Sequence, residues 1–223
     1  MSSKPPSQED VLRALSLALA FIIALAPPAE AAVKADAKKA VAPSSTDIVL
    51  GNPKAKVRVE EYASLSCTHC ARFNNEVFPA FKAKYIDTGK VAYVLHEFIT
   101  PPEQLAVAGF LLARCVAPSK YYSVIDDLFH RQARIYETHD LKDSIMAAGK
   151  TVGLTEEAVR ACLQNQQALD ALNKRVEAGL DAGVSATPTF LFNGVRAMEG
   201  EMTLEQLDSA YDAALKRKFK VSK

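Results

Sequence analysis

The chain has 223 residues, 49% of them apolar, which is enough to bury one good core or two small ones. Its 27 basic and 26 acidic side chains leave a formal charge of +1, so the composition gives no support for a nucleic-acid partner. The sequence has no fixed-period repeat, which argues against solenoid and fibrous classes.

The N-terminal segment has the pattern of an export signal. Basic residues precede the apolar run 14–26, and AEA at 29–31 is a small-residue cleavage pattern, so we predict a signal peptide over 1–31. An uncleaved membrane anchor is the alternative, although the run is shorter than the roughly 20 residues that span a bilayer. Residues 32–46 lack periodicity and are predicted to form a flexible tether. The mature protein is then expected in the periplasm or another extracytoplasmic compartment.

Strand, helix and strand patterns follow in that order. Residues 56–62 have the composition of a strand and end before a polar turn at 64–66. Apolar residues then recur every four positions, which predicts a helix over 67–87 with a kink at Pro79. The near-continuous apolar run 90–98 predicts a strand that is buried on both faces. Together these segments form a βαβ unit.

In the second half of the chain, helical patterns replace the strand patterns. Residues 102–183 have helical spacing and predict four or five helices. Two short strands are expected over 189–198, joined by the hairpin signal Asn193-Gly194, and a capping-box pattern opens a last helix over 203–218.

The whole order predicts an α/β, thioredoxin-like fold with an inserted helical domain. Residues 47–101 and 184–223 would form the thioredoxin-like domain, and residues 102–183 would form the helical insertion.

The most informative motif is Cys67-Thr68-His69-Cys70, which follows a predicted strand and opens a predicted helix. Unpaired N–H groups and the helix dipole favour an anion at such a position, so the pKa of Cys67 should be low. His69 can add a hydrogen bond or a positive charge. A stable thiolate is a good leaving group, which makes the disulfide form an oxidant.

Half of a zinc site is the alternative interpretation of two cysteines at this spacing. Such a site needs four ligands, and the sequence offers no second C-x-x-C pair and no closely spaced pair of histidines. The motif therefore predicts a redox pair without a metal or a cofactor.

Three sequence segments carry a family resemblance: LGNPKAKVRVEEY, SLSCTHCARF after a strand, and VSATPTFLFNG before a hairpin and a helix. With these segments the chain resembles the DsbA-like family of thiol-disulfide oxidoreductases, in its BdbD-related branch, over residues 47–215. The resemblance implies a nucleophile at Cys67, a buried partner at Cys70 and a cis-proline at Pro188. It also implies that the Thr187 backbone pairs with an extended substrate segment.

The resemblance also gives Glu61 a role, because relatives hold a carboxylate beneath the active site at this position. There it could shuttle the proton of Cys70. The alternative is a strand-end glutamate that is exposed to water. Thr68 departs from the family pattern, since many strongly oxidising relatives have proline there, and the redox potential stays open.

Cys115 and Cys162 lie in two predicted helices of the insertion. Four cysteines in an exported chain pair off evenly, and some DsbA-like relatives hold a second disulfide in this domain, so we expect a structural Cys115–Cys162 bond. Two small buried thiols are the alternative.

We therefore expect an exported protein disulfide oxidoreductase, a monomeric dithiol oxidase that passes its disulfide to exported substrate proteins with free thiols. The resemblance implies that a quinone-linked membrane protein reoxidises it. A disulfide isomerase, a client-specific reductase and a peptide-binding holdase chaperone are the alternatives.

Overall fold

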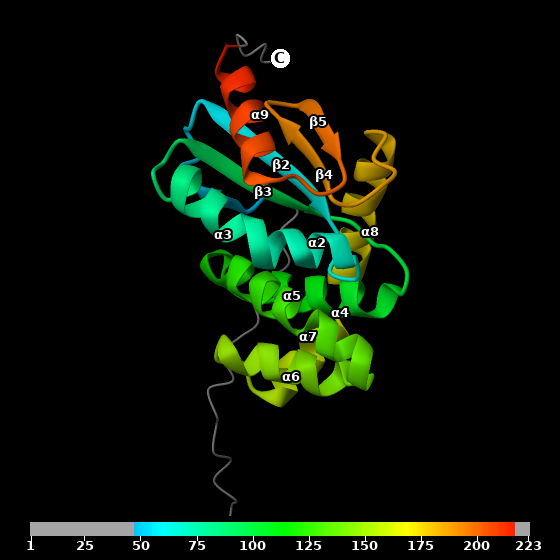
Figure 1. Ribbon diagram of the computed structural model, residues 1–223. Coiled ribbons are helices and arrows are strands. Elements are labelled where there is room, and N and C mark those ends of the chain that lie inside the picture. The colour runs from blue at the N-terminus through cyan, green and yellow to red at the C-terminus, as the bar shows by residue number, and fades with distance from the viewer. Residues whose placement is uncertain (1–46, 217–223) are drawn as a thin grey trace, which may run out of the picture. The chain divides into compact units, whose positions relative to one another are not determined.

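The computed structural model describes residues 47–216, whose five strands form one mixed sheet (Figure 1). The predicted signal peptide over 1–31, the predicted tether over 32–46 and residues 217–223 lie outside the described residues. The strand order is β1-β3-β2-β4-β5; β2 and β3 run parallel, and the other neighbours are antiparallel. The strands are β1 (Val49–Gly51), β2 (Val57–Ala63), β3 (Val91–Glu97), β4 (Thr189–Phe192) and β5 (Val195–Glu199).

The two central strands have the burial that their sequences predict. Every second residue of β2 is buried, and all residues of β3 except the half-buried His96 are buried, which confirms a strand covered on both faces. In the parallel register Val59 lies opposite Tyr93 and Glu61 lies opposite Leu95. Glu61 is two residues beyond Val59 in β2, so this register brings the Tyr93 side chain close to the Glu61 side chain.

Strand β1 is not predicted by the sequence analysis, because three residues give no periodic signal. It ends at Gly51, which has a φ of 90°. A Cβ atom there would lie 2.7 Å from the carbonyl oxygen of Val91, so the close approach of β1 to β3 requires glycine.

The helix after the active-site turn contains two π-helical segments in place of the single predicted kink. Its parts are α2 (Thr68–Arg72), η1 (Phe73–Val77), α3 (Phe78–Phe81) and η2 (Lys82–Ile86). Pro79 lies in the first turn of α3, directly after η1. A proline has no N–H to donate within a helix and its ring crowds the preceding turn, and a wider π turn relieves this conflict.

Five α-helices and one short 3₁₀ turn occupy the insertion between β3 and β4, which agrees with the four or five predicted helices. They are α4 (Glu103–Arg114), η3 (Pro118–Lys120), α5 (Tyr121–Thr138), α6 (Leu141–Thr151), α7 (Glu156–Leu163) and α8 (Gln166–Asp181). Thr155 caps α7 and Asn165 caps α8 through their side-chain oxygens. No helix within residues 47–216 is both long and apolar enough to cross a membrane.

A buried carboxylate, Glu97, ties the end of β3 to three helices of the insertion. Its oxygens accept hydrogen bonds from Arg114 of α4 and Arg175 of α8. The Tyr121 hydroxyl of α5 donates a third, at 3.0 Å. Because the Glu97 side chain is 0% exposed, these donors replace the water that it loses on folding.

The C-terminal part confirms two local sequence signals. Asn193 and Gly194 both have positive φ, 51° and 74°, as the tight hairpin between β4 and β5 requires. The last helix, α9 (Leu204–Lys216), opens with the predicted capping box, in which Thr203 and Gln206 exchange backbone-to-side-chain hydrogen bonds. The element order is therefore that of the predicted thioredoxin-like fold with an inserted helical domain.

Candidate active site

Cys67 and Cys70 lie at the start of the helix after β2, and both are free cysteines. Cys67 immediately precedes α2 and has extended backbone angles, φ −84° and ψ 120°. It is partly exposed, whereas Cys70 in the first helical turn is fully buried. The two sulfurs therefore experience different surroundings although two residues separate them.

The surroundings of the Cys67 sulfur favour its ionised form. The largest contribution is a hydrogen bond from the Cys70 thiol, followed by one from the Thr187 side chain and by the backbone N–H groups of Cys70 and His69. These donors outweigh the cost of partial burial and lower the pKa of Cys67 to about 5. Cys67 is therefore mainly a thiolate at neutral pH.

The surroundings of the Cys70 sulfur favour its protonated form. Burial is the main cause that raises its pKa well above that of a free thiol, and its hydrogen bond to Cys67 and the negative charge of Glu61 act in the same direction. Cys70 therefore keeps its proton at neutral pH, while Cys67 gives up its own.

Glu61 of β2 is close enough to Cys67 and Cys70 for their charges to interact, and it is only 2% exposed, so the alternative of a water-exposed strand end is wrong. The Tyr93 hydroxyl donates a hydrogen bond to its Oε2. The pKa of Glu61 is raised to about 8: burial is the largest cause, the Tyr93 hydrogen bond lowers the pKa in part, and the charge of Cys67 raises it. The Glu61 carboxyl is thus mostly protonated at neutral pH and can give a proton to a neighbour.

The peptide bond between Thr187 and Pro188 is cis and lies beside the cysteine pair. The Cys67 sulfur is 3.3 Å from the Thr187 carbonyl oxygen, a contact that the thiol makes as a donor. Pro188 is buried and Thr187 is half-buried, just before β4. This segment therefore forms one wall of the site.

The carbonyl groups of the active-site turn are bonded by side chains of the insertion. Gln132 of α5 donates to the carbonyl oxygens of Leu65, at 2.7 Å, and Cys67, at 3.1 Å. The Tyr136 hydroxyl, also from α5, donates to the Ser66 carbonyl at 2.6 Å. One helix of the insertion thus contacts three successive residues of the turn.

A second cis peptide bond, Pro101–Pro102, is also in contact with the turn. The Ser66 hydroxyl donates to the Pro102 carbonyl at 2.6 Å and accepts from the Ala106 N–H at 3.1 Å. The turn is therefore also fixed to the start of α4.

His69 is oriented by a carboxylate from the end of the sheet. Its Nδ1 contacts Glu201, which lies between β5 and α9, and Arg72 is 3.3 Å from the same carboxylate oxygen. The imidazole thus pairs with Glu201, while the backbone N–H of His69 acts on the Cys67 sulfur. Thr68, between the two cysteines, is exposed.

Cys115 and Cys162 are joined in a disulfide that links the end of α4 to α7. Their Cα atoms are 5.8 Å apart, within the usual range for such a bond. The bond lies entirely within the helical insertion.

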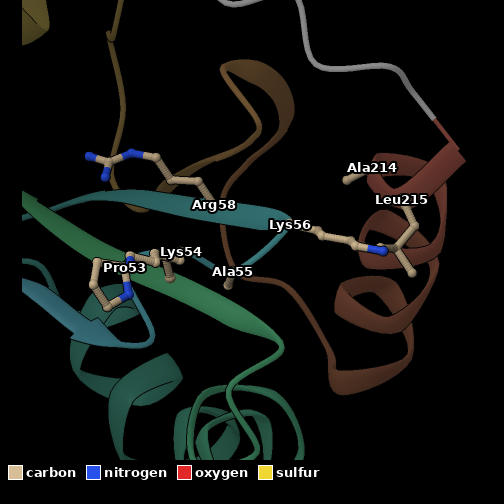
Figure 2. Close-up of a pocket in the computed structure, with 8 residues that line it drawn as sticks. Pro53, Lys54, Ala55, Lys56, Arg58, Ala214 and Leu215 are labelled. Atoms are coloured by element: carbon tan, nitrogen blue, oxygen red, sulfur yellow. The ribbon is translucent and has the colours of Figure 1, made fainter.

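A pocket of about 470 Å³ lies at the opposite end of β2 from the cysteines, between the β1–β2 connection and the end of α9 (Figure 2). Its lining residues are Pro53, Lys54, Ala55, Lys56, Arg58, Ala92, Ala214 and Leu215. It contains no thiol and no acid, so it offers nothing to thiol chemistry. Within residues 47–216 no group of three or more His, Cys, Asp or Glu side chains is arranged to hold a metal ion.

Several residues of the site are missed by sequence reasoning because their partners are far apart in the chain. Gln132 lies 65 residues from Cys67, and Glu201 lies 132 residues from His69. Neither is part of a short motif, and Tyr93 has the pattern of an ordinary core residue. The only available signal is a polar glutamine on the apolar face of a predicted helix, which is uncommon without a partner.

Comparison with known proteins agrees with this geometry. Residues 43–213 match the model of a thioredoxin family. A candidate protein-disulfide oxidoreductase of Rickettsia conorii is 32% identical over 180 residues, which cover 79% of this chain and 63% of the relative. The chain thus spans a little under two thirds of that relative's length. The probable disulfide bond formation protein D of Bacillus cereus is 25% identical over 178 residues, 78% of this chain and 81% of the relative.

Solved structures show the same fold. The crystal structure of Wolbachia pipientis alpha-DsbA1 has a TM-score of 0.68 and 27% identity, and the alignment covers 78% of this chain and 96% of that one. Oxidised BdbD from Bacillus subtilis has a TM-score of 0.67 at 19% identity, with 80% and 98% of the two chains covered.

Proposed function

The chain belongs to the thioredoxin family, in its DsbA-like branch, and from that premise we propose that it is a protein disulfide oxidase acting through Cys67 and Cys70. The observation that carries the proposal is the contrast between the two sulfurs. The pKa of Cys67 is lowered to about 5, whereas that of buried Cys70 is raised. A sulfur that is stable as a thiolate is a good leaving group from a mixed disulfide, which favours transfer of the disulfide to the substrate.

The proposed reaction begins with the pair as a disulfide. A substrate thiolate attacks the Cys67 sulfur, so that a mixed disulfide forms and Cys70 leaves as a thiolate, which takes up a proton. The second substrate thiolate then attacks the substrate sulfur of the mixed disulfide. The substrate disulfide forms, Cys67 leaves as a thiolate, and two electrons have passed from the substrate to the protein.

Glu61 is the proposed source of the proton for Cys70. It is buried, it is mostly protonated at neutral pH, and it is close enough to Cys70 for its ionised form to raise the pKa of that thiol. A buried thiolate without a proton donor is costly, so a nearby acid lowers the barrier for its departure.

Thr187 and Pro188 are the proposed contact for the substrate chain. The Thr187 carbonyl lies 3.3 Å from the Cys67 sulfur, and we propose that an extended substrate segment pairs with the backbone here. His69, held by Glu201, and the exposed Thr68 would border this segment.

The proposed place of action is outside the cytoplasm, after export by the predicted signal peptide over 1–31. The Cys115–Cys162 disulfide supports an oxidising compartment, since such bonds persist there. We expect the protein to act as a monomer on exported proteins with free thiols and to be reoxidised by a quinone-linked membrane protein.

The test combines a titration with a redox equilibrium. The ultraviolet absorbance of the thiolate should give a pKa near 5 for Cys67, and a Cys67→Ser variant should lose this transition. The oxidised protein should form disulfides in a reduced substrate protein, and the variant should not. A pKa of about 8 or above would remove the case for an oxidase, and a Cys67→Ser variant that still aids folding would indicate a holdase.

A further inference from the structure

The helical insertion supplies hydrogen-bond donors to the redox turn. Gln132 and Tyr136, four residues apart on α5, together bond the carbonyls of Leu65, Ser66 and Cys67. Side chains at this spacing lie on one face of a helix. Figure 1 shows α5 beside the helix that begins with α2, and the two elements are in contact.

The hydrogen bonds from Gln132 and Tyr136 lie in the turn that leads from β2 to Cys67. The Cys67 carbonyl already accepts the Ala71 N–H at 3.1 Å, and Gln132 is a second donor to the same oxygen. Carbonyl oxygens carry partial negative charge, and a donor offsets that charge close to the sulfur. The same bonds fix the orientation of the peptide groups that lead into the first helical turn, whose N–H groups act on the sulfur.

We propose that Gln132 and Tyr136 are positioning residues for the redox reaction, which hold the active-site turn in the geometry that stabilises the Cys67 thiolate. This inference rests on the proposed thiol-disulfide function. It makes the inserted domain part of the redox centre, although neither residue reacts.

Burial and proximity support this role. Gln132 is only 2% exposed, so its amide has exchanged water for the two carbonyls of the turn. Burial raises the pKa of Tyr136, and the charge of Cys67 adds to this effect, as expected for a hydroxyl close to the sulfur.

A purely structural role predicts something different, and the same helix provides the control. Tyr122, near the other end of α5, donates to the carbonyls of Ile48, at 2.7 Å, and Tyr93, at 3.4 Å, and accepts from the Leu95 N–H at 3.1 Å. Its hydroxyl thus binds backbone groups, as that of Tyr136 does, but none in the redox turn. Tyr122→Phe and Tyr136→Phe therefore remove the same chemical group from the same helix. Only Tyr136→Phe removes it from the redox turn.

The experiment uses the full chain and three variants: Tyr136→Phe, Gln132→Met and Tyr122→Phe. Tyr136→Phe removes one hydrogen bond to the turn and should raise the pKa of Cys67 by roughly 0.5 to 1, since one lost hydrogen bond is worth about that much. Gln132→Met removes two such bonds and should raise the pKa by at least as much. Equilibration with glutathione should then show a roughly 3- to 10-fold shift toward the disulfide form, because its thiolate product is less stable. Tyr122→Phe should leave both readouts at the wild-type values.

Wild-type values for both readouts in Tyr136→Phe would overturn the inference, even if that variant melts at a lower temperature. If Gln132→Met does not fold, Tyr136→Phe alone decides. Failure of the proposed function has another signature, because the wild-type protein itself would then lack a low thiol pKa and would not oxidise a reduced substrate.

Discussion

At the scale of single residues, the site combines a thiol whose pKa is lowered with a carboxyl whose pKa is raised. The Cys67 sulfur gains hydrogen-bond donors, whereas the Glu61 carboxyl loses water and keeps one donor, Tyr93. Both groups therefore depart from their ordinary state at neutral pH. Each departure changes the stability of the fold in a defined pH range.

Replacing Glu61 with glutamine should stabilise the protein increasingly as the pH rises. In the unfolded chain Glu61 loses its proton near pH 4.5, whereas the folded protein holds it until about pH 8. The folded protein therefore binds more protons in this window, and the carboxyl's contribution to stability is lost as the pH rises through it. Glu61→Gln removes this loss of stability. The variant should therefore be more stable than the wild type by on the order of a few kcal/mol near pH 8, and the advantage should vanish below about pH 4. Denaturant unfolding across this range measures the difference.

The neighbouring Glu60 gives a matched control with the opposite sign. A hydrogen bond with His96 is the main cause that lowers the pKa of Glu60. Its stabilising contribution is present above the unfolded pKa and is lost as the pH falls, so Glu60→Gln should destabilise the protein at neutral pH. If both variants gave the same pH dependence, the assigned environment of Glu61 would be incorrect.

Tyr93→Phe should change the pH dependence of catalysis while both cysteines stay in place. The Tyr93 hydroxyl lowers the pKa of Glu61, so its removal should raise that pKa above about 8. If protonated Glu61 serves Cys70, the fall in substrate oxidation at alkaline pH should then begin at a higher pH. The initial rate of thiol oxidation as a function of pH is the measurement. An unchanged profile would remove Glu61 from the proton pathway.

At the scale of helices and strands, local patterns predict the elements but not the contacts between them. The β2 and β3 strands, the hairpin at Asn193-Gly194 and the capping box of α9 are confirmed, because each depends on residues that are adjacent or a few positions apart. The π-helical segments around Pro79 are a local compromise that periodicity alone does not predict.

The same distinction between local patterns and distant contacts applies to the residues of the active site. The C-x-x-C motif identifies Cys67 and Cys70 because spacing and position carry their chemistry. Gln132 and Tyr136 reach the turn only because α5 packs beside α2, which no local pattern contains. The burial of Glu61 likewise depends on the neighbouring elements, so the sequence alone left two alternatives open.

The Cys115–Cys162 bond gives a prediction at this scale. The two cysteines have a sequence separation of 47. By restricting the unfolded chain, a disulfide that closes such a loop stabilises the fold by at most about 4 kcal/mol. Replacing both cysteines with alanine should lower the melting temperature by several degrees. Because the bond links α4 to α7, away from the redox turn, the Cys67 titration should not move.

Peptide mapping of the non-reduced, alkylated protein is the direct measurement for this bond. Separate alkylation of Cys115 and Cys162 after purification from an oxidising compartment would contradict it. A changed Cys67 titration in the double variant would mean that the insertion transmits this change to the turn.

At the scale of the whole described chain, polar contacts join the sheet to the insertion, and two groups of them lie at Glu97 and at the redox turn. Glu97 binds groups of α4, α5 and α8 at the end of β3, and the redox turn binds α5. Because these contacts are shared, opening of the insertion should disturb the cysteine pair. The stability of the fold and the redox state of the pair should therefore be linked.

The link between the stability of the fold and the redox state of the cysteine pair should depend on pH. In the reduced protein the pKa of Cys67 is about 5, against 9.0 for the free thiol. Between these values the unfolded chain binds one more proton than the folded protein, so the stability of the reduced form rises with pH and is lost as the pH falls toward 5. The oxidised form has no thiol at this position and lacks this contribution. The difference in melting temperature should thus move in favour of the reduced form between pH 5 and 8.

Because Cys67 is partly exposed, we reduce the effect for solvent screening to about 2 kcal/mol at pH 8, or roughly 4–8 °C in melting temperature for a chain of this size. Glu61 opposes part of this change, because the Cys67 thiolate raises the pKa of Glu61 in the reduced form. The Glu61→Gln variant removes that opposition and should show a steeper pH dependence than the wild type. A melting-temperature difference that stays constant from pH 5 to 8 in both proteins would show that Cys67 titrates as an ordinary thiol.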